Sequence, residues 1–158
     1  MFAKYKNHDY IYIKNKRKSE IITTQAHKTD SSFTKERNVY VKSIPEENLS
    51  TIFDVTIYVS YETNIPNTPK EWKLNYTLEP ISDKVSLVFA EGILPGWLIL
   101  EKNVCQKEVS LSELTNAKVI FTYKKKDDYV LKNELVEELI IPVTELPYYF
   151  EKYNRLSI

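Results

Sequence analysis

The chain has only two glycines, Gly92 and Gly96, among its 158 residues. Loops that cradle phosphates need several residues free to adopt positive φ or to approach a phosphate closely, so the composition argues against P-loop or Rossmann-type nucleotide binding. A single cysteine, Cys105, rules out an internal disulfide framework and is typical of a reducing compartment.

The chain also lacks an excess of either charge, with 22 Lys and Arg against 22 Asp and Glu. No global field is available to hold nucleic acid or an acidic membrane, so charged recognition must be local. Its longest apolar run, "ILPGWLIL", is too short to span a bilayer, and "MFAKYKNHDYIYIKNKRK" contains no apolar core of a secretory signal. We therefore expect a cytoplasmic protein without membrane contact.

What the chain does have is alternation of apolar and polar residues with a period of two. It is clearest at residues 53–61, and residues 10–25 and 72–89 each suggest a hairpin. The aromatic fraction of 13% also favours strands. The pattern predicts a mainly β protein with short helices, of the α+β class.

A second pattern is an internal repeat, because "NVYVKSIPEENL" at 38–49 resembles "NVCQKEVSLSEL" at 103–114. The offset is 65 residues here and 64 for Ile21 and Val85. We infer a tandem duplication, giving two similar small antiparallel β modules packed together. The predicted domains, with a linker that contains two prolines, are a first module at 1–62, the linker at 63–70 and a second module with a C-terminal extension at 71–158.

Both copies contain Ser-x-x-Glu, at Ser43 to Glu46 and Ser110 to Glu113, which is the spacing of a helix capping box. These glutamates are therefore interpreted as caps and not as a catalytic pair. At the C-terminus, helical spacing predicts a short helix around 146–153, with Thr144 as its cap, whereas 135–141 suits either a helix or a strand.

No pattern indicates catalysis. Cys105 would need a base, and only His8 and His27 are present, without metal-ligand spacing. We predict no catalytic, cofactor-binding or metal residues, no cofactor, no small-molecule ligand and no enzymatic activity. Carboxylates that meet only in the folded chain leave carboxylate-based chemistry as an open alternative.

Binding of another macromolecule is the remaining function class. The basic run "KNKRK" at 14–18 suits a nucleic-acid contact, but a solvated hairpin turn explains it better. The segment 133–153 combines acidic and aromatic residues and suits either a basic partner or closure of the core. The predicted partner-binding residues are Trp97, Glu134, Glu137, Glu138, Glu145, Tyr148 and Tyr149.

The stretches "MFAKYKNHDYIYI", "YVKSIPEENL" and "PGWLILEKNVCQKEVSLSEL" resemble, in cadence and strand order, immunity proteins of bacterial polymorphic and contact-dependent inhibition toxins. The resemblance implies that the chain forms a tight complex with a cognate protein toxin, such as a basic nuclease domain, and blocks it. It has no diagnostic motif, so it assigns no site residues. A nucleic-acid-binding protein and a phage or structural β protein are the alternatives.

Overall fold

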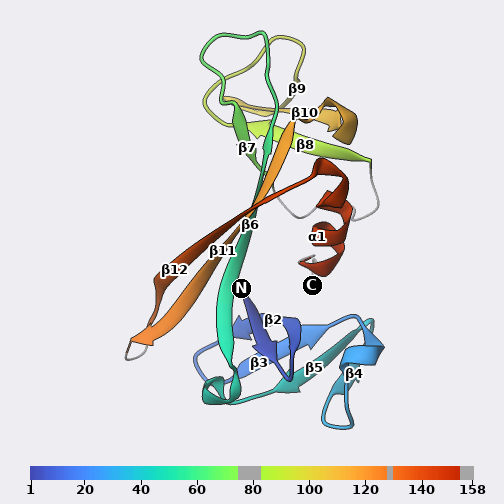
Figure 1. Cartoon of the computed structure of the whole chain (residues 1–158), viewed down its shortest axis with the longest axis vertical. Coiled ribbons are helices and arrows are strands. Elements are labelled where there is room, and N and C mark those ends of the chain that lie inside the picture. The colour runs from blue at the N-terminus through green and yellow to red at the C-terminus, as the bar shows by residue number, and fades with distance from the viewer. Residues whose placement is uncertain (75–82, 128–129, 154–158) are drawn as a thin grey trace. The chain divides into compact units, whose positions relative to one another are not determined.

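The structure is a computed structural model that describes residues 1–74, 83–127 and 130–153 (Figure 1). It is mostly β, with two sheets and one short C-terminal α-helix, which confirms the predicted fold class. Contacts divide the chain into a first unit, Met1–Val55 with Phe121–Glu137, and a second unit, Thr56–Ile120 with Glu138–Ile158.

The first unit is built on antiparallel strands in the order β1-β2-β3-β5-β4. Its apolar side chains alternate with polar ones, and one face forms a buried cluster that includes Tyr10, Tyr12 and Ile21. Its elements are β1 Phe2–Tyr5, β2 His8–Lys14, β3 Ser19–Thr23, β4 Thr34–Glu36 and β5 Val39–Ser43, with the 3₁₀ helices η1 Ala26–Lys28 and η2 Glu46–Asn48.

The second unit contains a three-stranded sheet in the order β8-β10-β9 and a short strand, β7, that pairs with β6. The predicted hairpin at 72–89 is not seen in the described parts, since β7 and β8 pair with different strands, and its turn lies outside the described residues. The elements are β7 Glu71–Lys73, β8 Lys84–Phe89, β9 Leu98–Glu101, β10 Val104–Ser110, the 3₁₀ helices η3 Leu111–Glu113 and η4 Val143–Glu145, and α1 Leu146–Lys152.

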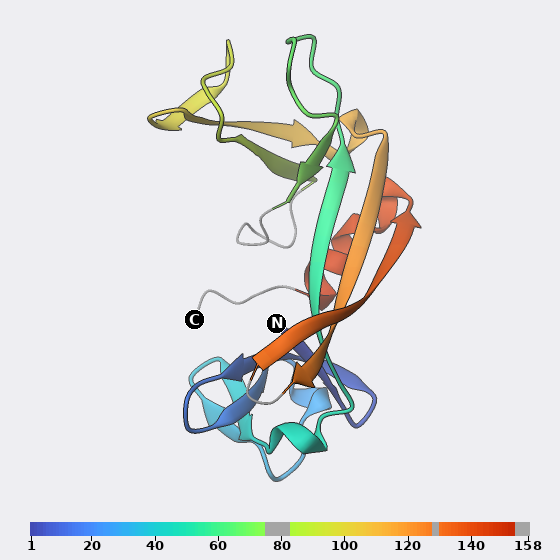
Figure 2. The ribbon, with the colours of Figure 1, turned by 90° about the vertical axis from the view of Figure 1, so that its left-hand side faces the viewer.

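Three long strands, β6 Thr51–Ser60, β11 Asn116–Asp127 and β12 Val130–Ile141, run side by side (Figure 2). In the larger sheet the pairing order is β12-β11-β6-β1-β2-β3-β5-β4, so β12 lies at its edge. The segment 135–141 is thus a strand. Its neighbour β11 precedes it directly, which agrees with the predicted hairpin, whose residues 128–129 lie outside the described ranges.

The terminal helix α1 follows the predicted spacing. Leu146 is fully buried and Tyr153 is 3% exposed, while Pro147 occupies the first turn, where no helical amide is lost. The predicted cap was wrong, because the residue at the N-cap is Glu145 and Thr144 lies in the preceding 3₁₀ turn η4. The two turns run directly into each other, which moves the start of the α-helix one residue further along.

The two units share a strand-pairing pattern. In the first unit Ala3 of β1 pairs with Tyr10 of β2, and in the second Val59 of β6 pairs with Trp72 of β7. All four side chains are at most 3% exposed. The second half of β6 therefore has the place in the second unit that β1 has in the first. Tandem duplication remains a prediction, and this shared pattern is the observation that it would explain.

The strand that follows obeys the same pattern with a corrected alignment. In the first unit Ile21 pairs with Lys42, and in the second Leu87 pairs with Lys107. The counterpart of Ile21 is therefore Leu87, not Val85 as the sequence alignment predicted. Low identity permits such a slip, because moving a strand by two residues leaves the same side chains on the buried face.

The predicted linker at 63–70 is a hairpin loop inside the second unit. It joins β6 to β7, and the Tyr61 amide donates a hydrogen bond to the Lys70 carbonyl at 3.0 Å to close it. The corresponding connection in the first unit is the tight turn Lys6-Asn7, with φ of 45° and 66°. Prolines mark a loop but do not distinguish a hairpin loop from a domain linker. The unit boundaries consequently differ from 1–62 and 71–158.

Candidate functional site

Two of the predicted acidic residues lie in the first unit, on β12, and interact with β11. Glu134 is 3.7 Å from the Lys125 ammonium, and Glu137 accepts a hydrogen bond from the Tyr123 hydroxyl at 3.1 Å. Their side chains stay on the surface. β11 thus offsets part of the acidic charge that the sequence assigned to a basic partner.

The same part of β12 exposes apolar side chains. Val130 is 60%, Leu135 58% and Val136 59% exposed. No strand among the described residues pairs with the outer side of β12, since it ends the strand order. We call the segment 130–137 the β12 edge. It combines apolar side chains, carboxylates and free backbone groups.

The other predicted residues belong to the second unit. Glu138 forms an ion pair with Lys118 at 3.3 Å, and Glu145 is exposed at the start of α1. Tyr148 is 57% exposed and meets the half-buried Tyr149 edge to face, with ring centroids 5.2 Å apart. The seven predicted residues are thus divided between the two units.

Trp97 is a core residue in this structure. Its side chain is 8% exposed and stacks on Trp72, with ring centroids 5.4 Å apart, and Trp72 in turn contacts Phe89. The prediction that Trp97 offers its indole to a partner meets the difficulty that packing already covers it. A glycine and a proline beside a tryptophan suggested an exposed loop, but the burial of its side chain depends on contacts distant in sequence.

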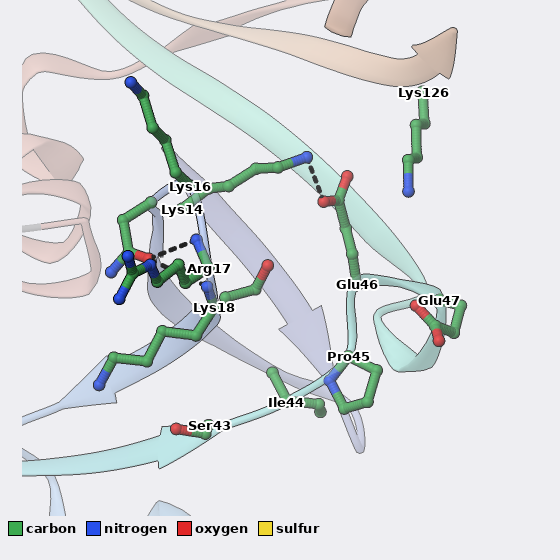
Figure 3. Close-up of a pocket in the computed structure, with 12 residues that line it drawn as sticks. Lys14, Lys16, Arg17, Lys18, Ser43, Ile44, Pro45, Glu46, Glu47 and Lys126 are labelled. Carbon is green, nitrogen blue, oxygen red and sulfur yellow. Dashed lines mark hydrogen bonds and ion pairs between the residues drawn. The ribbon is translucent and has the colours of Figure 1, made fainter. Parts of the chain in front are cut away.

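The structure also contains an open depression that sequence reasoning missed, with a volume of about 1040 Å³. We call it the basic depression (Figure 3). Lys126 of β11 reaches it from more than a hundred residues away in the sequence, which no local pattern reveals. Its lining residues are Lys14, Asn15, Lys16, Arg17, Lys18, Ser19, Ser43, Ile44, Pro45, Glu46, Glu47 and Lys126.

Glu46 in this depression is an ion-pair partner and not a helix cap. The N-cap of η2 is Pro45, and the Glu46 carboxylate, 9% exposed, lies 2.5 Å from the Lys14 ammonium (Figure 3). Burial raises the pKa of Glu46, but the hydrogen bond and charge of Lys14 outweigh it, so the pKa is lowered. In the second copy the expected capping contact is present, because the Ser110 amide donates to the Glu113 carboxylate at 2.7 Å.

We predict that Glu46→Gln lowers the free energy of unfolding by about 1 kcal/mol at pH 7, because it removes a largely buried charge-assisted contact. Since the folded-state pKa is lowered, this contribution is present above the unfolded pKa of about 4.3 and is lost as pH falls through the folded value. Urea denaturation at pH 7 and at pH 3 measures both effects.

The matched control is Glu47→Gln, an exposed neighbour in the same depression, which should change stability by less than about 0.5 kcal/mol. A Glu46→Gln difference that stays constant from pH 7 to pH 3 would contradict the role of the ion pair.

Cys105 is the buried structural cysteine that the sequence predicts. It is fully buried, accepts a hydrogen bond from the Leu94 amide at 3.4 Å and donates one to the Gly92 carbonyl at 3.6 Å. Within the described ranges, no group of three or more His, Cys, Asp or Glu side chains is placed to hold a metal ion. No helix of the described residues is long and apolar enough to cross a membrane.

Compared with models of protein families, with curated proteins and with solved structures, the chain matches none of them.

Proposed function

We propose that the chain is a protein-binding protein of the immunity type, which binds a cognate toxin through the β12 edge and neutralises it. The observation that carries the proposal is a long edge strand with three side chains near 60% exposure, Val130, Leu135 and Val136. Exposed apolar edges are sites of strand addition, in which backbone hydrogen bonds supply affinity and side chains supply specificity.

The charges on the β12 edge favour a different protein over a second copy of the chain. Antiparallel self-pairing centred between Leu135 and Val136 would place Glu134 opposite Glu137, and like charges directly opposite each other are destabilising. A partner strand with Lys or Arg at these places would instead form cross-strand ion pairs. A basic toxin domain meets this requirement.

A cytoplasmic location accompanies the proposal. Neutralisation of a toxin inside the producing cell requires a protein that folds under reducing conditions, and the one cysteine is free and buried. Glu138, Glu145, Tyr148 and Tyr149 stay predicted contacts on the second unit.

The experiment is co-purification with the product of the adjacent gene, followed by titration calorimetry. We expect a 1:1 complex with a Kd in the nanomolar range, as for other standard-sized specific interfaces. The double variant Leu135→Lys/Val136→Lys should weaken the complex about 100-fold, because it replaces apolar contacts by charges that repel a basic partner.

Leu98→Lys is the matched control, since Leu98 is also on an edge strand, is 64% exposed and lies in the second unit. It should leave affinity unchanged within about threefold. The proposal fails if the two proteins do not associate at about 10 μM, a concentration at which a specific complex is saturated. Equal loss by Leu98→Lys would move the interface away from β12.

A further inference from the structure

The basic depression has no part in the proposed complex. Five of its lining side chains are basic and two are acidic, in a chain whose formal net charge is zero. We propose that the basic depression binds a small ligand that carries a polyphosphate group. The observations that support this are the rigidity of its turn, the availability of its charges and the chemistry of its walls.

The turn between β2 and β3 is preorganised by Asn15. Its side-chain oxygen accepts hydrogen bonds from the amides of Arg17 at 3.1 Å and Lys18 at 2.9 Å, and its own amide donates to the Lys18 carbonyl at 3.0 Å. These bonds fix the backbone that carries three consecutive basic residues. A fixed backbone reduces the ordering cost of binding.

The charges on this turn are not all used within the protein. Lys14 is paired with Glu46 and Lys18 with Glu20, each at 2.5 Å. By contrast, in the part of the chain that the structure describes, no ion pair or side-chain hydrogen bond engages the ammonium of Lys16 or the guanidinium of Arg17. These two cations are exposed at the rim, and Figure 3 shows them on the turn opposite Lys126.

The residue types indicate phosphate as the anion. The Arg17 guanidinium suits the fork of two phosphate oxygens, and lysines act as point charges that close around the remaining oxygens. No glycine-rich loop is needed, because side chains and not backbone amides supply the positive charge. The acidic Glu46 and Glu47 on one wall confine an anion to the side of the turn.

The walls favour a small ligand over a nucleic-acid strand. None of the lining side chains is aromatic, so bases have no stacking platform, which single-strand binding proteins use for about 1–3 kcal/mol per base. The volume of about 1040 Å³ accommodates a small molecule.

The test is titration calorimetry of the full chain with sodium tripolyphosphate and, separately, with ATP, at low salt. We expect a Kd below about 1 mM for both probes, weakening as salt rises. The double variant Lys16→Gln/Arg17→Gln should weaken binding at least about tenfold, which corresponds to the loss of two charge-assisted contacts. Equal affinity for the two probes assigns recognition to the phosphates, and tighter ATP binding adds the nucleoside to it.

Lys35→Gln/Arg37→Gln is the matched control, because it neutralises another exposed Lys and Arg near a turn of the same unit. It should change the Kd by less than about twofold. Absence of binding by the wild-type chain at about 1 mM, or equal weakening by the control, would overturn the proposal. So would tighter binding of a dT oligonucleotide than of tripolyphosphate, which would assign the depression to nucleic acid.

Discussion

Trp72→Ala is expected to lower the free energy of unfolding by about 3–5 kcal/mol, the largest effect of any single substitution proposed for this chain. Trp72 is 3% exposed and stacks on Trp97. Its indole N–H donates a hydrogen bond to the Tyr61 carbonyl at 3.0 Å, at the entry to the 63–70 loop. Truncation therefore opens a cavity and also leaves a carbonyl acceptor without its partner.

Urea denaturation followed by circular dichroism measures this loss, and the midpoint should fall without a change in slope. Lys73→Ala is the control, because Lys73 is the exposed neighbour on the same strand and should shift stability by less than about 0.5 kcal/mol. A Trp72→Ala cost below about 1 kcal/mol would mean that the two indoles do not form the core of the second unit.

Leu87→Ala should have the second-largest effect, a loss of about 2–5 kcal/mol. Leu87 is fully buried at the position that pairs with Lys107, as Ile21 is at the position that pairs with Lys42. Because the two positions are equivalent in the pairing, Ile21→Ala should cost a similar amount.

Val88→Ala provides the matched comparison, since Val88 follows Leu87 on β8 but is only partly buried. It should cost less than about 1 kcal/mol, because part of its side chain is already in water. A larger loss from Val88→Ala than from Leu87→Ala would contradict the pairing of β8 with β10 and the corrected alignment of the repeat.

Features that depend on neighbouring residues were predictable. The period-two pattern of residues 53–59 marks β6, whose Phe53, Val55, Ile57 and Val59 are all buried. The Ser110–Glu113 capping contact joins residues three apart, so its spacing is visible in the sequence. The helix at the C-terminus follows from the spacing of Leu146 and Tyr153 in the same way.

Features that depend on strand register were not predictable. Ser43 to Glu46 has the same spacing as Ser110 to Glu113, yet Glu46 pairs with Lys14, 32 residues away. The prolines of 63–70 indicated a break, but only the pairing of β6 with β7 shows that this break is a hairpin loop. Trp97 looked like a surface residue until its neighbour Trp72 was placed.

The sequence by itself determined the β-rich fold class, the approximate strands and the repeated phrase, because each depends on side-chain alternation or on contacts within a few residues. Only the tertiary structure decided which strand lies at the edge, where β12 exposes Leu135 and Val136, and which side chains surround the basic depression. The physical reason is that alternation selects the buried face of a strand, whereas the choice of its neighbour depends on packing between segments distant in the sequence.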